Sequence, residues 1–110
     1  MAYGRRPEAA FAYAWEYRVA PQAIAAFEAA YGPHGVWVAL FSKHPGYMAT
    51  QLLHDREDPT RYLTVDYWRS RSDYESFRRD SAVEFEATDR ACEALTTDER
   101  HVGDFSIVNS

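Results

Sequence analysis

The sequence predicts an α+β fold of the ferredoxin-like βαββαβ type, in which a four-stranded antiparallel sheet carries two helical segments on one face. Hydrophobic residues recur with period two in four segments and at helical intervals in two others. These segments follow one another as strand, broken helix, strand, strand, broken helix, strand. The chain has 110 residues, the size of one domain. We expect this domain over residues 11–110, after a flexible leader of residues 1–10.

The first half of the chain changes from strand-like to helical spacing. Large side chains occupy every second position of residues 11–19, which predicts the first strand. Pro21 suits the first turn of a helix, which should continue to Tyr31. The segment Gly32-Pro33-His34-Gly35 should end this helix. A short apolar helix is then expected over residues 36–42.

Two strands, a second broken helix and a last strand complete the predicted order. Residues 47–55 and 61–69 are typical of strands, and a charged turn separates them. In Ser72-Asp73-Tyr74-Glu75, the serine should cap the next helix while the glutamate reaches back to it. A kink is expected near Asp80-Ser81. The last strand is predicted over residues 101–108, where a glycine marks an expected β-bulge.

Composition and charge exclude several classes of partner. The formal net charge is −5, which repels a phosphate backbone and argues against nucleic acid. No apolar run is long enough to cross a bilayer, so a membrane is not an expected partner, and no secretory signal is expected at the N-terminus. The one cysteine, Cys92, cannot form an internal disulfide, which fits a cytoplasmic location.

The predicted second and third strands are partly apolar on both faces. Helices that lie on one side of the sheet leave the other face bare, and a second copy of the same sheet is its simplest cover. Aromatic residues make up 15% of the chain, more aromatic surface than so small a domain readily buries. We therefore expect an obligate homodimer.

The chain contains the motifs Trp15-Glu16-Tyr17-Arg18-Val19, Gly35-Val36-Trp37, Pro45-Gly46-Tyr47, Arg61-Tyr62-Leu63 and Cys92-Glu93-Ala94-Leu95-Thr96. In this order and spacing they resemble the antibiotic biosynthesis monooxygenase domain family over about residues 11–107. The resemblance implies a dimeric α+β barrel, with two sheets packed face to face and a cavity between each sheet and its own helices. Similar members include cofactor-independent oxygenases of polyphenolic substrates, for which no cofactor is expected, and oxygenases that degrade haem.

The haem-degrading branch of the family does not fit this sequence. Its pattern has an asparagine on the first strand, a tryptophan at the end of the third, and a histidine ligand on the following helix. Trp68 matches the tryptophan, but the first strand offers Glu16 or Tyr17, and residues 82–94 contain no histidine. The polyphenol branch uses a buried tryptophan with asparagine and tyrosine to deprotonate its substrate. Trp68 and several tyrosines fit that pattern, although the only asparagine, Asn109, lies at the chain end.

Asp66 is the first candidate for catalysis. A carboxylate on a strand that is covered on both sides should be paired or should have a raised pKa. A raised pKa suits a general base that takes a phenolic proton. The alternative, which the sequence favours, is a structural ion pair with Arg18 or Arg100.

Two histidines and five aromatic residues are the other candidate site residues. His44 and His54 are candidate proton shuttles near neutral pH. The four histidines of the chain lack the spacing of a metal site, so no metal is expected. Substrate contacts are expected from aromatic side chains at the cavity: Trp68, Trp37, Phe41, Tyr17 and Tyr47. The alternative for Trp68, Trp37 and Phe41 is simple core packing, and the alternative for the tyrosines is a place at the dimer interface.

Two functions remain open from the sequence. One is a cofactor-independent monooxygenase, or a related enzyme, that acts on a small aromatic or polyphenolic molecule bound between sheet and helices. The other is a non-catalytic homodimer that binds a small molecule or has a structural role. An unpaired Asp66 facing an open cavity would favour the enzyme. A salt-bridged Asp66 beneath a filled interior would favour the second function.

Overall fold

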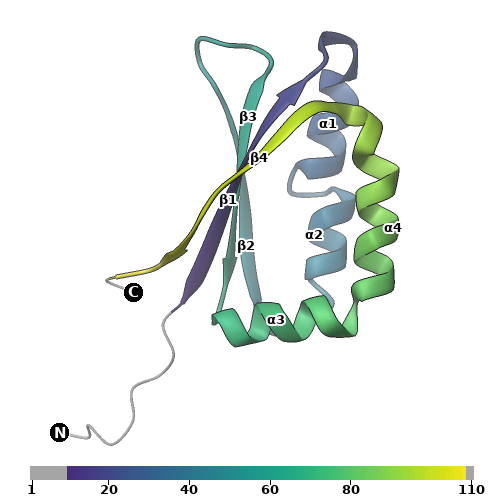
Figure 1. The fold of residues 1–110 in the computed structure, drawn as a ribbon. Coiled ribbons are helices and arrows are strands. Elements are labelled where there is room, and N and C mark those ends of the chain that lie inside the picture. The colour runs from purple at the N-terminus through teal and green to yellow at the C-terminus, as the bar shows by residue number, and fades with distance from the viewer. Residues whose placement is uncertain (1–9, 109–110) are drawn as a thin grey trace, which may run out of the picture.

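The computed structural model describes residues 10–108, so the predicted leader lies outside the described residues except for Ala10. Its four strands form one antiparallel sheet in the order β2-β3-β1-β4: β1 (Phe11–Val19), β2 (Tyr47–His54), β3 (Arg61–Trp68) and β4 (Thr96–Ser106). Helices cover one face of this sheet (Figure 1): η1 (Pro21–Ala23), α1 (Ile24–Tyr31), α2 (Val36–Phe41), α3 (Arg71–Asp80), α4 (Ala82–Cys92) and η2 (Glu93–Leu95). The predicted ferredoxin-like α+β fold is confirmed.

The first broken helix divides at its glycines, as predicted. α1 ends at Tyr31 and α2 begins at Val36. A Cβ atom at Gly35 would lie 2.1 Å from the carbonyl oxygen of Ala30, so only glycine fits this close approach. The tight turn keeps α2 over the sheet, where its Trp37 is buried.

The second broken helix begins earlier than predicted, and the expected cap at Ser72 was wrong. α3 begins at Arg71, and the Oγ of Ser70 accepts a hydrogen bond from the backbone N–H of Asp73 at 3.1 Å. Ser70 has the extended backbone of an N-cap because the chain has just left β3. The predicted kink is confirmed, since α3 ends at Asp80 and α4 starts at Ala82 in a different direction (Figure 1).

β4 begins at Thr96, not at His101, so the predicted boundary of the last strand was wrong. The first half of β4 lacks apolar alternation because it is exposed, and it is held by backbone pairing with β1 from Thr96 onwards. The register shifts where Ala14 pairs with Gly103 and Trp15 pairs with His101. This irregularity lies at the glycine where a bulge was expected.

The two faces of the sheet differ in what covers them. On β3, the even-numbered residues Tyr62, Thr64, Asp66 and Trp68 face the helices and are each at most 5% exposed. The odd-numbered residues Leu63, Val65 and Tyr67 alternate to the opposite face and are half-buried. Their cross-strand neighbours on that face include Leu53, Ala12 and Ala14, with Phe105 next to Ala12. We call this surface the open sheet face. The described helices leave it uncovered (Figure 1).

No helix among residues 10–108 has the length and apolar character needed to cross a membrane.

Candidate functional site

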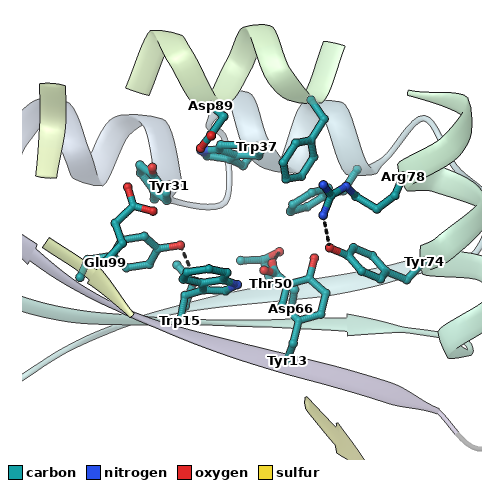
Figure 2. A pocket seen from close by; sticks show the side chains of 14 residues that line it. Tyr13, Trp15, Tyr31, Trp37, Thr50, Asp66, Tyr74, Arg78, Asp89 and Glu99 are labelled. Atoms are coloured by element: carbon teal, nitrogen blue, oxygen red, sulfur yellow. Dashed lines mark hydrogen bonds between the residues drawn. The ribbon is translucent and has the colours of Figure 1, made fainter. Parts of the chain in front are cut away.

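A cavity of about 290 Å³ lies between the sheet and the helices (Figure 2). Its volume is just below the range of about 300–1,000 Å³ that is usual for small-molecule sites. The interior of the domain is therefore not completely filled by side chains. The sheet contributes Tyr13, Trp15, Tyr17, Thr50, Thr64, Asp66 and Glu99, and the helices contribute Tyr31, Trp37, Phe41, Tyr74, Arg78, Phe85 and Asp89.

Asp66 lies on the sheet side of the cavity and forms no ion pair with any described residue. The residue is 5% exposed, and its Oδ1 accepts a hydrogen bond from the hydroxyl of Thr50, its cross-strand neighbour. Among residues 10–108, no donor reaches its second oxygen, Oδ2. The ion pair that the sequence favoured was wrong, because Arg18 pairs with Asp58 and Arg100 pairs with Glu16.

Burial without a positive neighbour changes the acidity of Asp66. Desolvation raises its pKa to about 6, although the hydrogen bond from Thr50 acts in the opposite direction. The carboxyl group therefore exchanges its proton in the range where a general base is useful at neutral pH. Perturbed acids of this kind gather at functional sites, and Asp66 combines its shift with an open cavity.

The tyrosines around Asp66 are donors rather than bases. Burial raises the pKa of Tyr13 and of Tyr17 well above the usual tyrosine value, so both hydroxyls keep their protons. Tyr13 is the cross-strand neighbour of Asp66, and its hydroxyl accepts a hydrogen bond from the Trp68 indole N–H at 3.3 Å. The hydroxyl of Tyr17 lies 3.2 Å from the hydroxyl of Thr64. These contacts fix the aromatic rings around the carboxyl group.

Four of the predicted site residues line the cavity together: Asp66, Tyr17, Trp37 and Phe41. Tyr47 lies one contact away, because its hydroxyl is 2.7 Å from the hydroxyl of Thr50, which in turn bonds to Asp66. Trp68 is fully buried behind Tyr13 and does not line the cavity. The structure therefore brings Asp66 together with aromatic walls and puts Trp68 in the core.

The two candidate histidines lie away from the cavity lining. His54 is exposed at the end of β2, where it stacks on Tyr62 with ring centroids 4.1 Å apart. His44 is half-buried, and its Nδ1 accepts a hydrogen bond from the backbone N–H of Gly46 at 3.0 Å. Neither histidine borders the space above Asp66. Within the described range, no group of three His, Cys, Asp or Glu side chains could hold a metal ion.

Several residues that line the cavity were not predicted from the sequence. Tyr13 and Trp15 share the alternating face of β1 with Tyr17, so the period-two pattern could have identified them. Thr50 could be found only from the register between β2 and β3, which the sequence does not reveal. Arg78 follows Tyr74 by one helical turn, and this spacing was an available signal.

The chain is similar to a known family in sequence and to several solved structures in fold. Residues 11–87 match the family model described as antibiotic biosynthesis monooxygenase. SnoaB, a cofactor-independent oxygenase from Streptomyces nogalater, superposes with a TM-score of 0.69 at 20% identity, over 93% of this chain and 96% of that chain. A Bordetella bronchiseptica protein of the antibiotic biosynthesis monooxygenase type gives 0.71 at 21% identity, over 92% and 99%. No significant match is found among curated protein sequences.

Identities this low show a shared fold, and they carry no reaction from one protein to the other. The match to the family model shows more than a shared fold, because it spans more than half of the chain. It includes β1 to β3 and most of the residues that line the cavity. The chain belongs to the antibiotic biosynthesis monooxygenase family.

Proposed function

We propose that this protein is a cofactor-independent monooxygenase that acts on a small aromatic molecule of the polyphenol type. The observation that carries the proposal is Asp66, a buried carboxyl group without an ion pair that lies beside an open, aromatic-lined cavity. The likeness to SnoaB, which is described as a cofactor-independent oxygenase, supports the same type of chemistry.

Asp66 would begin the reaction by removing a proton from an activated CH₂ group or a phenolic hydroxyl of the bound substrate. The resulting anion is electron-rich and can reduce O₂ directly. For a CH₂ group, one atom of O₂ becomes the new carbonyl oxygen, and the other leaves as water with the two hydrogens. The carbon supplies all four electrons that O₂ takes up, so the balance needs no further reductant. Asp66 returns its proton to the departing oxygen.

The aromatic walls suit a flat substrate. Trp15, Tyr17 and Trp37 line the cavity, and Tyr17 and Trp37 are each held by contacts with Tyr31, at ring-centroid distances of 5.1 Å and 6.0 Å. Preset aromatic surfaces bind a fused ring without a large loss of side-chain freedom. The substrate would therefore lie on these rings with its acidic position towards Asp66.

Oxygen uptake with a small panel of substrates tests this function. Anthrone and 1,4-dihydroxynaphthalene are mixed with the protein, and O₂ consumption is followed beside product formation. We expect one O₂ consumed for each anthrone converted to anthraquinone, at a rate well above the reaction without protein. No uptake above that background with either compound would contradict the proposal. Tight binding without uptake would favour the alternative, a non-catalytic binding homodimer.

We also propose that the protein is a homodimer joined through the open sheet face. That face carries Leu53 and Phe105, which are 44% and 50% exposed, and burying such apolar side chains drives association. We expect Val65→Glu, in the middle of this face, to prevent dimerisation in sedimentation velocity runs at micromolar concentration and, because the dimer is expected to be obligate, to lose folded structure in circular dichroism. Val83→Glu on α4 is the control, because Val83 is 81% exposed on the helical layer, and this variant should stay dimeric. A monomeric wild-type protein would refute the proposed dimer.

We also propose that the protein is located in the cytoplasm. The chain has one cysteine, and this residue, Cys92, is buried, with a pKa that burial raises. A protonated, covered thiol needs no disulfide partner, which suits a reducing compartment.

A further inference from the structure

The geometry points to Arg78 as a specificity-determining residue: we propose that the substrate is an aromatic carboxylate whose acid group binds the Arg78 guanidinium. This inference rests on the proposed function and narrows its substrate class. Three observations support the inference. The guanidinium is held at the cavity by neighbouring side chains, it has no ion-pair partner among the described residues, and the charges around the cavity are separated.

The guanidinium of Arg78 is fixed at the cavity by side chains from two helices. Its Nη1 donates a hydrogen bond to the hydroxyl of Tyr74 on α3 at 3.0 Å. Its Cζ lies 3.9 Å from the centroid of the Phe85 ring on α4, a close cation–π contact. Tyr74 and Phe85 line the same cavity. A long, flexible side chain is thereby held in one place, and less freedom is lost when it binds a ligand.

Within the described part of the chain Arg78 has no ion pair, unlike Arg71 and Arg90 on the same two helices. Arg71 on α3 pairs with Glu75, and Arg90 on α4 pairs with Glu86. Arg78 donates to the neutral Tyr74 hydroxyl instead. A guanidinium has five N–H donors, so most of its fork is available to a ligand. Its planar shape matches a carboxylate, which it can hold with two parallel hydrogen bonds.

The charges of the cavity are separated along its length. In Figure 2, Arg78 and Tyr74 lie at one end, Asp89 and Glu99 lie towards the other, and Asp66 lies between them on the sheet. A ligand carboxylate is attracted to the Arg78 end and repelled from the acidic end. The aromatic ring is therefore bound in one direction only. With its acid group anchored at Arg78, the ring extends over Asp66, which selects the ring position that loses a proton.

A matched pair of probes tests this inference without oxygen chemistry. The probes are 3-hydroxy-2-naphthoate and 3-hydroxy-2-naphthamide, which have the same two rings and differ in charge. Their dissociation constants are measured by isothermal titration calorimetry at pH 8. We expect the wild-type protein to prefer the carboxylate by about tenfold or more, since hydrogen bonds between charged partners contribute about 1.5–3 kcal/mol and 1.4 kcal/mol is tenfold.

Three variants distinguish the effect of the Arg78 charge on binding from the effect of the shape of its side chain. Arg78→Gln should lose the preference by weakening the carboxylate alone, and Arg78→Lys should keep part of it. Arg79→Gln is the control, because Arg79 is also exposed on α3, donates to the hydroxyl of Ser76 and does not line the cavity. Its affinities should equal those of the wild type. Arg78 is exposed, so its variants should fold, which circular dichroism checks.

Four outcomes would overturn the inference. They are equal wild-type affinities for the two probes, no binding of either probe, an equal loss of both affinities in Arg78→Gln, and an Arg79→Gln variant that behaves as Arg78→Gln does. Failure of the proposed function looks different. If no substrate supports oxygen uptake but the Arg78-dependent preference persists, the oxygenase is refuted and the carboxylate site stands.

Discussion

Replacing Asp66 with asparagine is expected to lower the rate of substrate oxidation by a factor of about 10²–10⁴, the usual contribution of a general base. The amide has nearly the same shape and can still accept a hydrogen bond from Thr50, but it cannot take the substrate proton. Initial rates of O₂ uptake at saturating substrate measure the loss. Asp89→Asn is the matched control, because the Asp89 carboxylate also lines the cavity, towards the end away from Arg78. This substitution should change the rate much less.

The pH dependence of the wild-type rate should report the same carboxyl group. Burial raises the pKa of Asp66 to about 6, and only the ionised form accepts a proton. The rate should therefore rise with pH through about 6 and then level off. The residual rate of Asp66→Asn should lack this step. A flat wild-type profile between pH 5 and 7 would argue against Asp66 as the base.

The same substitution should make the protein more stable at neutral pH. The folded-state pKa of about 6 lies above the ordinary value of 3.8, so the folded protein binds this proton more tightly than the unfolded chain does. The free energy of unfolding therefore falls as pH rises from about 4 to about 6. Above pH 6 the buried carboxylate costs about 3 kcal/mol, from roughly two pKa units at 1.36 kcal/mol each.

Thermal unfolding of the two proteins at two pH values tests this cost. Asp66→Asn should melt at a higher temperature than the wild type at pH 7.5 and at a similar temperature at pH 4. Opposite changes in activity and stability would identify a residue that is kept for chemistry rather than for folding. A lower melting temperature of the variant at pH 7.5 would show instead that Asp66 stabilises the fold.

Trp68→Ala is expected to lower the free energy of unfolding by about 3–5 kcal/mol, the usual cost of removing a large aromatic side chain from a core. Trp68 is fully buried, and its ring packs against Phe41, Tyr47 and Phe77 with centroids 5.8, 5.5 and 5.2 Å apart. The change would also remove the hydrogen bond to Tyr13. Urea unfolding measures the loss.

Trp15→Ala provides the comparison for Trp68, because Trp15 is only half-buried and lines the cavity. This variant should lose less stability and more affinity for a flat ligand. If Trp68→Ala does not fold, Trp68→Phe supplies the measurement, and it should keep most of the stability. A Trp68 variant with near wild-type stability and no ligand binding would reassign this residue from the core to the cavity wall.

Alternation and helix breakers were sufficient to predict most of the fold. β1 could be predicted because its large aromatic residues occupy every second position and point to one side. The break between α1 and α2 could be predicted from Gly32-Pro33-His34-Gly35, and the structure adds the reason for Gly35, which approaches the backbone of Ala30 closely. The first half of β4 could not be predicted from the sequence. Its residues from Thr96 to Arg100 are polar, and all but Thr96 are exposed. They form a strand through backbone pairing with β1, which produces no hydrophobic pattern in the sequence.

One possible partner of Asp66 could be excluded from the sequence, and its actual partner could not be predicted. Arg18 is the cross-strand neighbour of Arg61, an odd-numbered residue of β3, so it lies on the opposite face from Asp66. The alternation already contained this information, and it excluded the favoured ion pair. The contact between Thr50 and Asp66 could not be predicted, because it depends on the register of β2 against β3. Register is set by the whole sheet and cannot be read from one strand.

The proposed base and the proposed anion site lie on different elements of the chain, and this separation affects how such a protein can acquire new substrates. Asp66 is carried by a central strand whose neighbours Val65 and Tyr67 point to the open sheet face. Substitutions there would alter chemistry and assembly together. Arg78 projects from an exposed position on α3, where a substitution would change which ligand binds and would leave Asp66 and the open sheet face intact. Homologues and laboratory variants should therefore acquire new substrates through α3 and α4, while the strand that holds the acid stays unchanged.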